Sequence, residues 1–149
     1  MSASQDLAFL LRRDLGRLKQ EIAAFPPDDR LWQTLPGIAN SAGNLALHIE
    51  GNLREYIGRQ LGQVPYERKR PLEFSSKGLP LTEILARMEQ LEATIPDLVA
   101  ALTESQMEAP YPENVLGEPM STRRFLLHLH GHLQYHTGQV NYLRRILTA

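Results

Sequence analysis

The chain has 149 residues, of which 42% are hydrophobic and 22% charged, and its formal net charge is −1. This length and composition predict one soluble globular domain over residues 1–149 with a real apolar core. The near-neutral charge does not favour nucleic-acid binding, and no apolar run approaches the ~18 residues of a membrane span. Because cysteine is absent, disulfides, thiolate metal ligands and cysteine nucleophiles are excluded. The N-terminus lacks a signal-peptide pattern, so we expect a cytoplasmic protein.

The first predicted helix begins with Ser4 as its N-cap. Apolar residues then recur at steps of three and four as far as Phe25, which is the period of a helix with one buried stripe. Two prolines follow Phe25 directly and end the helix, because proline cannot continue it.

A second helix is predicted from residue 40 or 41 to about residue 61. Its apolar residues form one arc on a helical wheel, and His48 lies at the edge of that arc. Asn44 and Asn52 flank His48 one turn away on either side. Glu50 lies about 200° round the wheel and therefore cannot share a ligand with His48.

Two segments contain prolines and glycines and show no helical period. Residues 62–80 include three prolines and a basic run at 67–70, which together predict a long crossover loop with a solvated charged surface. Residues 103–120 have the same character and are predicted to form a second loop.

Two further helices complete the chain. The third begins at Leu81 or Thr82, kinks at Pro96 and continues through Leu102, and the last begins after the N-cap Ser121. Four amphipathic helices, two long connections and no strand pattern predict an all-α fold, a four-helix bundle.

The last helix contains four of the five histidines. With His132 set at zero on the wheel, His128 and His136 lie about 40° to either side, whereas His130 lies about 160° away. The face shared by the first three also carries apolar residues and should point into the core. A buried imidazole there needs a hydrogen-bond partner or a metal ion.

His132 and His136 stand one helical turn apart, the spacing that lets two imidazoles bind one metal ion. His128 and His132 offer an equally good pair, and His48 adds a third ligand from a second core helix. Three histidines without a fourth protein ligand would leave positions for water or substrate, as in catalytic sites. The alternative is a cluster of buried histidines that hydrogen-bond to backbone carbonyls and to amide side chains, namely Asn44, Asn52 and Gln139.

Two stretches of the sequence resemble the signatures of the DinB-like family. They are S-A-G-N-L-A-L-H-I-E-G-N-L-R-E-Y-I-G around His48 and H-L-Q-Y-H-T-G-Q-V around His136. The order of helices and loops also fits, so the resemblance covers nearly the whole chain. It implies an up-down-down-up four-helix bundle with long crossover loops.

The resemblance also implies which histidines bind a metal. The ligands would be His48, His132 and His136, with the Thr137-Gly138-Gln139 that follows fixing the last of them. His128 would then be a second-shell or cleft residue, together with Asn44, Asn52 and Gln139. His130 would be a surface residue. The ion would be divalent, with Ni, Zn, Fe and Mn as candidates.

Characterised relatives include metal-dependent transferases and isomerases that use bacillithiol or mycothiol. The resemblance therefore implies an S-transferase that acts on a small-molecule substrate with a low-molecular-weight thiol, as a homodimer without nucleic-acid or membrane partners. Arg59, or Lys and Arg of 67–70, are candidates to receive an acidic thiol or substrate. A metal-dependent hydrolase stays open, although the sequence places no carboxylate near the three histidines. A non-catalytic bundle, with a structural metal or histidine cluster and an outer face for a dimer or partner contact, also stays open.

Overall fold

The structure is a computed structural model that describes residues 1–149. It is helical, and its only β-type pairing is an isolated bridge between Pro110 and Ser121. Three short helices accompany the four long ones, and the second long helix ends in a π-helical turn, η2. The long helices are α1 (Ala3–Ala23), α2 (Ala42–Leu53, followed by η2, Arg54–Arg59), α4 (Leu81–Ala100) and α6 (Thr122–Leu147); the short ones are η1 (Asp29–Trp32), α3 (Arg70–Ser75) and α5 (Glu104–Glu108).

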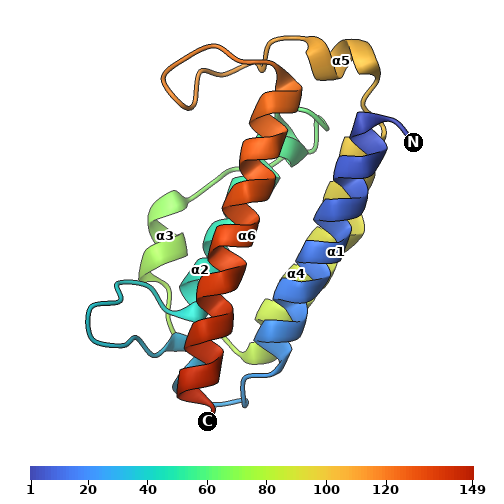
Figure 1. Ribbon diagram of the computed structural model, residues 1–149. Helices are drawn as coiled ribbons and strands as arrows, with labels where there is room; N and C mark the ends of the chain where they lie inside the picture. Colours follow the sequence, from blue (N-terminus) through green and yellow to red (C-terminus); the bar gives the residue numbers. More distant parts are fainter.

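The four long helices run in two directions. Trp32, which follows α1, packs on Gly43 at the start of α2 and donates its Nε1–H to the carbonyl of Leu79 just before α4. The end of α1 and the starts of α2 and α4 therefore lie together. At the same end, Asn141 near the end of α6 donates to Glu21 of α1. Thus α1 and α6 run one way and α2 and α4 the other (Figure 1).

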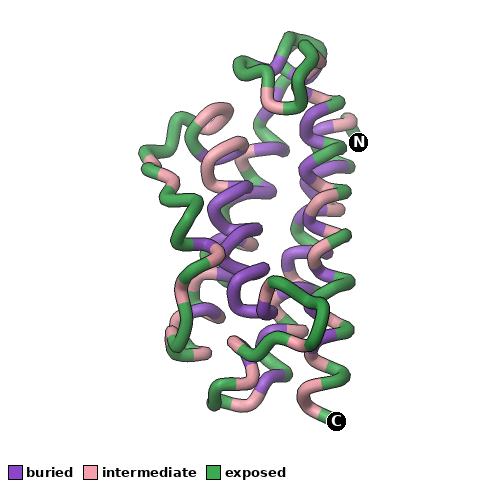
Figure 2. The backbone as a smooth tube through the Cα atoms, turned by 90° about the vertical axis from the view of Figure 1, so that its left-hand side faces the viewer, coloured by how far each residue is buried: buried purple, intermediate pink, exposed green.

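The core lies between these helices and consists of 29 buried apolar side chains. The helices α1, α4 and α6 each turn one buried stripe inward, whereas every residue of α2 is buried, as the purple segments of the tube show (Figure 2). Burial of this apolar surface is the main contribution to the stability of such a bundle. It also holds α2 and α6 beside each other, which positions the histidines.

Serine side chains cap three of the long helices. Ser121 accepts a hydrogen bond from a backbone N–H in the first turn of α6, as predicted. Ser41 does the same for α2, where only the start of the helix was predicted. The prediction of Ser4 as the cap of α1 is wrong. Ser2 and Gln5 form a reciprocal capping box there, and Ser4 is buried inside the first turn.

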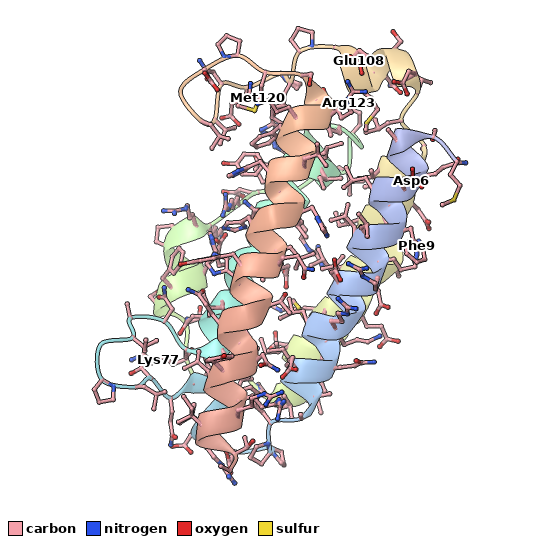
Figure 3. The ribbon with its side chains drawn as sticks, in the orientation of Figure 1. Asp6, Phe9, Lys77, Glu108, Met120 and Arg123 are labelled. Atoms are coloured by element: carbon pink, nitrogen blue, oxygen red, sulfur yellow. The ribbon has the colours of Figure 1, made fainter.

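The two predicted loops each contain a short helix. In 62–80, the six-residue α3 begins with a proline in its first turn, and Asn44 of α2 holds it by donating to the carbonyls of Glu73 and Ser76. In 103–120, α5 is tied to α6 by an ion pair of 2.5 Å between Glu108 and Arg123 (Figure 3). Helices of five or six residues are too short to show a hydrophobic period, so the pattern did not reveal them.

The third helix continues through Pro96, as predicted, but it ends at Ala100 and does not reach Leu102. No helix in the structure is both long enough and apolar enough to cross a membrane.

Candidate metal centre

The structure brings together His48 of α2 and His132 and His136 of α6. The Nε2 atom of His132 lies 3.1 Å from the Nε2 atoms of both His48 and His136. All three ligand atoms lie within 4.8 Å of one another. The antiparallel packing of α2 on α6 sets His48 opposite two consecutive turns of α6, whose imidazoles project to the same point.

A metal ion fits this arrangement. Tetrahedral ligation with metal–nitrogen bonds of about 2.05 Å would separate neighbouring nitrogens by about 3.3 Å, and two of the observed separations are 3.1 Å. Metal binding would require a shift of the rings that brings the remaining pair, the Nε2 atoms of His48 and His136, from within 4.8 Å to the same separation.

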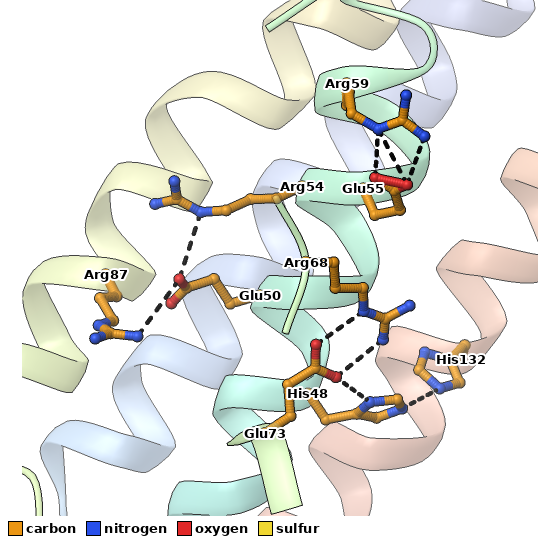
Figure 4. A network of polar contacts seen from close by, with 9 residues as sticks. All are labelled: His48, Glu50, Arg54, Glu55, Arg59, Arg68, Glu73, Arg87 and His132. Atoms are coloured by element: carbon orange, nitrogen blue, oxygen red, sulfur yellow. Dashed lines mark hydrogen bonds and ion pairs between the residues drawn. The ribbon is translucent and has the colours of Figure 1, made fainter. Parts of the chain in front are cut away.

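Glu73 of α3 fixes the ring of His48. Its Oε1 atom lies 2.9 Å from Nδ1 of His48 (Figure 4). A carboxylate only accepts hydrogen bonds, so Nδ1 carries the proton and the Nε2 of His48 presents its lone pair to the other two histidines. Glu73 is buried, and such carboxylate–histidine pairs orient metal ligands in proteins.

Gln139 fixes the ring of His136 in the same way. Its Oε1 atom accepts a hydrogen bond of 2.7 Å from Nδ1 of His136, so the Nε2 of His136 also presents a lone pair. The resemblance predicted this role for the residues after His136, and the geometry agrees with it.

The three Nε2 atoms cannot satisfy one another. Those of His48 and His136 both lack a proton, and the Nε2–H of His132 can donate only one hydrogen to two acceptors at 3.1 Å. A cation between them would accept all three lone pairs. The chemistry of the donor set therefore favours a metal over a purely hydrogen-bonded cluster.

Burial favours the neutral form of His132 and His136, the form that binds metals. Burial, reinforced by the neighbouring histidines, lowers the pKa of His132 to about 4. Burial also lowers the pKa of His136. Burial alone would raise the pKa of Glu73, but its hydrogen bonds from His48 and Arg68 hold that pKa below its usual range, so Glu73 is a carboxylate at neutral pH.

The absence of a side chain at Gly51 makes room for the carboxylate of Glu73. A Cβ atom on Gly51, in α2, would lie 1.9 Å from Oε2 of Glu73 and 2.6 Å from its Cδ. The carboxylate thus rests against the bare backbone of α2. Sequence reasoning missed Glu73 because it lies in the expected loop 62–80, where no period places any side chain.

The other residues predicted to support the metal ligands make no hydrogen bond to the three histidines. Asn44 anchors α3 and so supports Glu73 indirectly. Asn52 is buried and its side-chain oxygen has no hydrogen-bond partner. His128 is exposed, stacks on Phe125, and its ring centre lies 6.5 Å from that of His132. It lies beside the site rather than in it.

The prediction that His130 is a surface residue is wrong. Its Nε2 lies 2.7 Å from Oδ2 of Asp14 in α1, a carboxylate whose side chain is fully buried. Arg13 and Arg17 also donate to Asp14. The side of α6 opposite the metal site faces α1 instead of solvent, and the wheel of a single helix does not show that neighbour.

The basic residues near the site differ from the prediction at one position. Lys69 and Arg70 are exposed, as expected for a solvated run, and Arg59 pairs with Glu55 on the surface. Arg68, in contrast, is nearly buried and donates two hydrogen bonds to Glu73.

Comparisons with known proteins agree with this fold. The sequence model of the DinB superfamily matches residues 10–140. A crystal structure of a DinB-like protein from Bacillus cereus ATCC 10987 superposes with a TM-score of 0.67 at 18% identity, over 89% of this chain and 84% of that one. No curated protein matches the sequence. At this identity the structural match shows the fold alone.

Proposed function

This chain belongs to the DinB superfamily, and we propose that it is a metal-dependent enzyme of the thiol S-transferase type. The observation that carries the proposal is the convergence of three Nε2 lone pairs from His48, His132 and His136 on one point. Three histidines without a fourth protein ligand leave room for an exchangeable ligand.

The bound ion would act as a Lewis acid that lowers the pKa of a thiol and so supplies a thiolate at neutral pH. The chain's own residues hold and orient the site. Glu73 and Gln139 keep the protons of their histidines on Nδ1, and the core packing of α2 and α6 fixes the spacing.

The same geometry disfavours a hydrolase. Glu73 is the carboxylate next to the three histidines, and both of its oxygens already accept hydrogen bonds from Arg68, one of them also from His48. A carboxylate so engaged is a poor general base for water. The thiol supplies its own nucleophile and needs no such base once its pKa is lowered.

A groove of about 760 Å³ lies on the side of Gln139, although none of the three histidines lines it. It reaches Gln139, which bonds His136, and its volume suits a small molecule. It is mostly apolar and lies between α6 and the segment before α2; its lining includes Leu35, Ile38, Tyr135, Tyr142 and Ile146. The groove supports a small-molecule substrate with an apolar part.

Metal analysis of protein purified without a histidine tag tests the metal, and Co(II) reconstitution followed by thiol titration tests the chemistry. We expect one divalent ion per chain, and a sulfur-to-Co(II) absorption band when a thiol is added. His48→Ala and His136→Ala should lose the metal. His130→Ala is the matched control on the opposite side of α6 and should keep it.

A non-catalytic role for the same site is the second candidate, because the three histidines join α2 to α6 and a metal there would also brace the bundle. In that case Co(II) would bind and raise the melting temperature, but no thiol would produce the sulfur band. Less than stoichiometric metal even after reconstitution would refute both candidates.

A further inference from the structure

Arg68 has an unused hydrogen-bonding edge. Its Nε and Nη2 atoms donate to the two oxygens of Glu73 at 2.8 and 2.9 Å. Its Nη1 atom donates to neither oxygen of Glu73 and is not among the polar atoms sealed from solvent without a partner, although the side chain of Tyr56 also interacts with the guanidinium. The side chain is 12% exposed. A guanidinium held in this way can still donate to a ligand.

This edge lies beside the candidate metal centre. Arg68 and His48 share Glu73 as their acceptor, and the free amino group of Arg68 points to the side where His132 lies (Figure 4). The positive charge of Arg68 also contributes to the lowered pKa of His132. The guanidinium further lies 5.6 Å over the ring of Tyr56. Glu73 therefore holds one edge of the guanidinium, and the ring of Tyr56 packs on its face.

Rigid placement distinguishes Arg68 from other cations in this part of the chain. Arg70 is exposed and lies over the ring of Phe74. Arg59 donates to Glu55 through the same two nitrogens as Arg68 does to Glu73, but its side chain is 48% exposed. A nearly buried guanidinium with free donors is less hydrated and better oriented, and such groups recognise carboxylates through their planar geometry.

We propose that Arg68 forms a subsite for an anionic group of the substrate, a carboxylate, next to the exchangeable position of the metal. The inference rests on the proposed function, because the substrate is taken to ligate the metal through its thiolate while its carboxylate accepts from the free edge of Arg68. Arg68 thereby selects thiols that carry a carboxylate over neutral thiols.

The test uses Co(II)-loaded protein and three thiols, namely mercaptoacetate, 3-mercaptopropionate and 2-mercaptoethanol. The sulfur-to-Co(II) band gives each dissociation constant. In the unaltered protein we expect at least one of the two carboxylates to bind about tenfold more tightly than 2-mercaptoethanol, as for one charge-assisted hydrogen bond. In Arg68→Met this preference should disappear. For each variant, the dissociation constant of a carboxylate thiol is divided by that of 2-mercaptoethanol. Comparison of this ratio between variants cancels the intrinsic differences between the thiols.

Arg59→Met is the matched control, because it removes an exposed arginine of the same chain and should keep the preference. If Arg68→Met fails to load Co(II), Arg68→Lys keeps a positive charge beside Glu73 while it removes the planar fork, and it should reduce the preference severalfold. An equal preference in the unaltered protein and in the loaded Arg68 variant, or no preference in the unaltered protein, would overturn the inference.

Failure of the proposed function has a different signature. If Co(II) binds but none of the three thiols produces the band, the thiol chemistry is refuted. Azide, whose Co(II) band needs no thiol, then tests Arg68 alone. A dissociation constant that rises about tenfold in Arg68→Met supports an anion subsite, and an unchanged constant contradicts it.

Discussion

Replacement of Gly51 by alanine has two opposite effects on the stability of the fold. In an ordinary helix interior, Gly→Ala is stabilising by about 1 kcal/mol, because alanine loses less backbone entropy. At position 51 the added Cβ would lie 1.9 Å from Oε2 of Glu73 and 2.6 Å from its Cδ. The carboxylate would have to move by about 1 Å or more to restore a normal van der Waals distance.

That movement breaks contacts that orient the site. Glu73 holds His48 at 2.9 Å and Arg68 at 2.8 and 2.9 Å, and a shift of this size takes at least one of these hydrogen bonds out of range. Loss of a partner that orients a metal ligand lowers metal affinity about 10- to 100-fold. A buried hydrogen bond to a charged group contributes about 1.5–3 kcal/mol, which exceeds the gain in helix propensity. We expect Gly51→Ala to be destabilising by about 1–2 kcal/mol net.

Urea unfolding followed by circular dichroism, and Co(II) titration against a chelator, measure the two effects. Gly131→Ala in α6 is the matched control, because an added Cβ there meets nothing within 4 Å, and it should stabilise the fold. Without the Glu73 carboxylate the clash is gone, so the double variant Gly51→Ala with Glu73→Ala should be more stable than Glu73→Ala alone, and its metal affinity should equal that of Glu73→Ala. If Gly51→Ala stabilises the protein as Gly131→Ala does and keeps full metal affinity, Glu73 does not orient His48.

Three further predictions concern stability, pH and assembly. Asp14→Asn should lower the free energy of unfolding by about 1–3 kcal/mol in urea titrations, because the buried carboxylate accepts charge-assisted hydrogen bonds; His130→Ala should do the same without release of Co(II), and metal loss would contradict the register of α6. Without metal, the fold should lose stability as the pH falls from about 6.5, the ordinary histidine value, toward the pKa of about 4 of His132. In that window the unfolded chain binds more protons than the folded one. The free energy of unfolding therefore falls by at most about 1.4 kcal/mol per pH unit for one site, and by less here because His132 is partly exposed to solvent. A flat profile from pH 7 to 4 would show that His132 is not held neutral by burial. The homodimer stays a prediction from the family resemblance, and light scattering should find twice the 16.9 kDa of one chain.

The sequence by itself determined the helices and the histidine register. Apolar residues at steps of three and four define the buried stripes of the long helices, and the wheel separates His130 from His132 and His136 because each residue turns about 100°. The resemblance then indicated His48 as the third member of the set. Gln139 was also predictable, since it lies three residues after His136 on the same helix and local spacing alone brings the two together.

The tertiary structure decided what surrounds the three histidines. Glu73 and Arg68 come from a segment without a period, and they reach His48 only because Asn44 holds α3 against α2 and Gly51 leaves space for the carboxylate. The pairing of His130 with the buried Asp14 likewise depends on which helix packs on the far side of α6. Periodicity fixes which face of a helix is buried, whereas the neighbour that covers that face is set by packing between segments far apart in the chain.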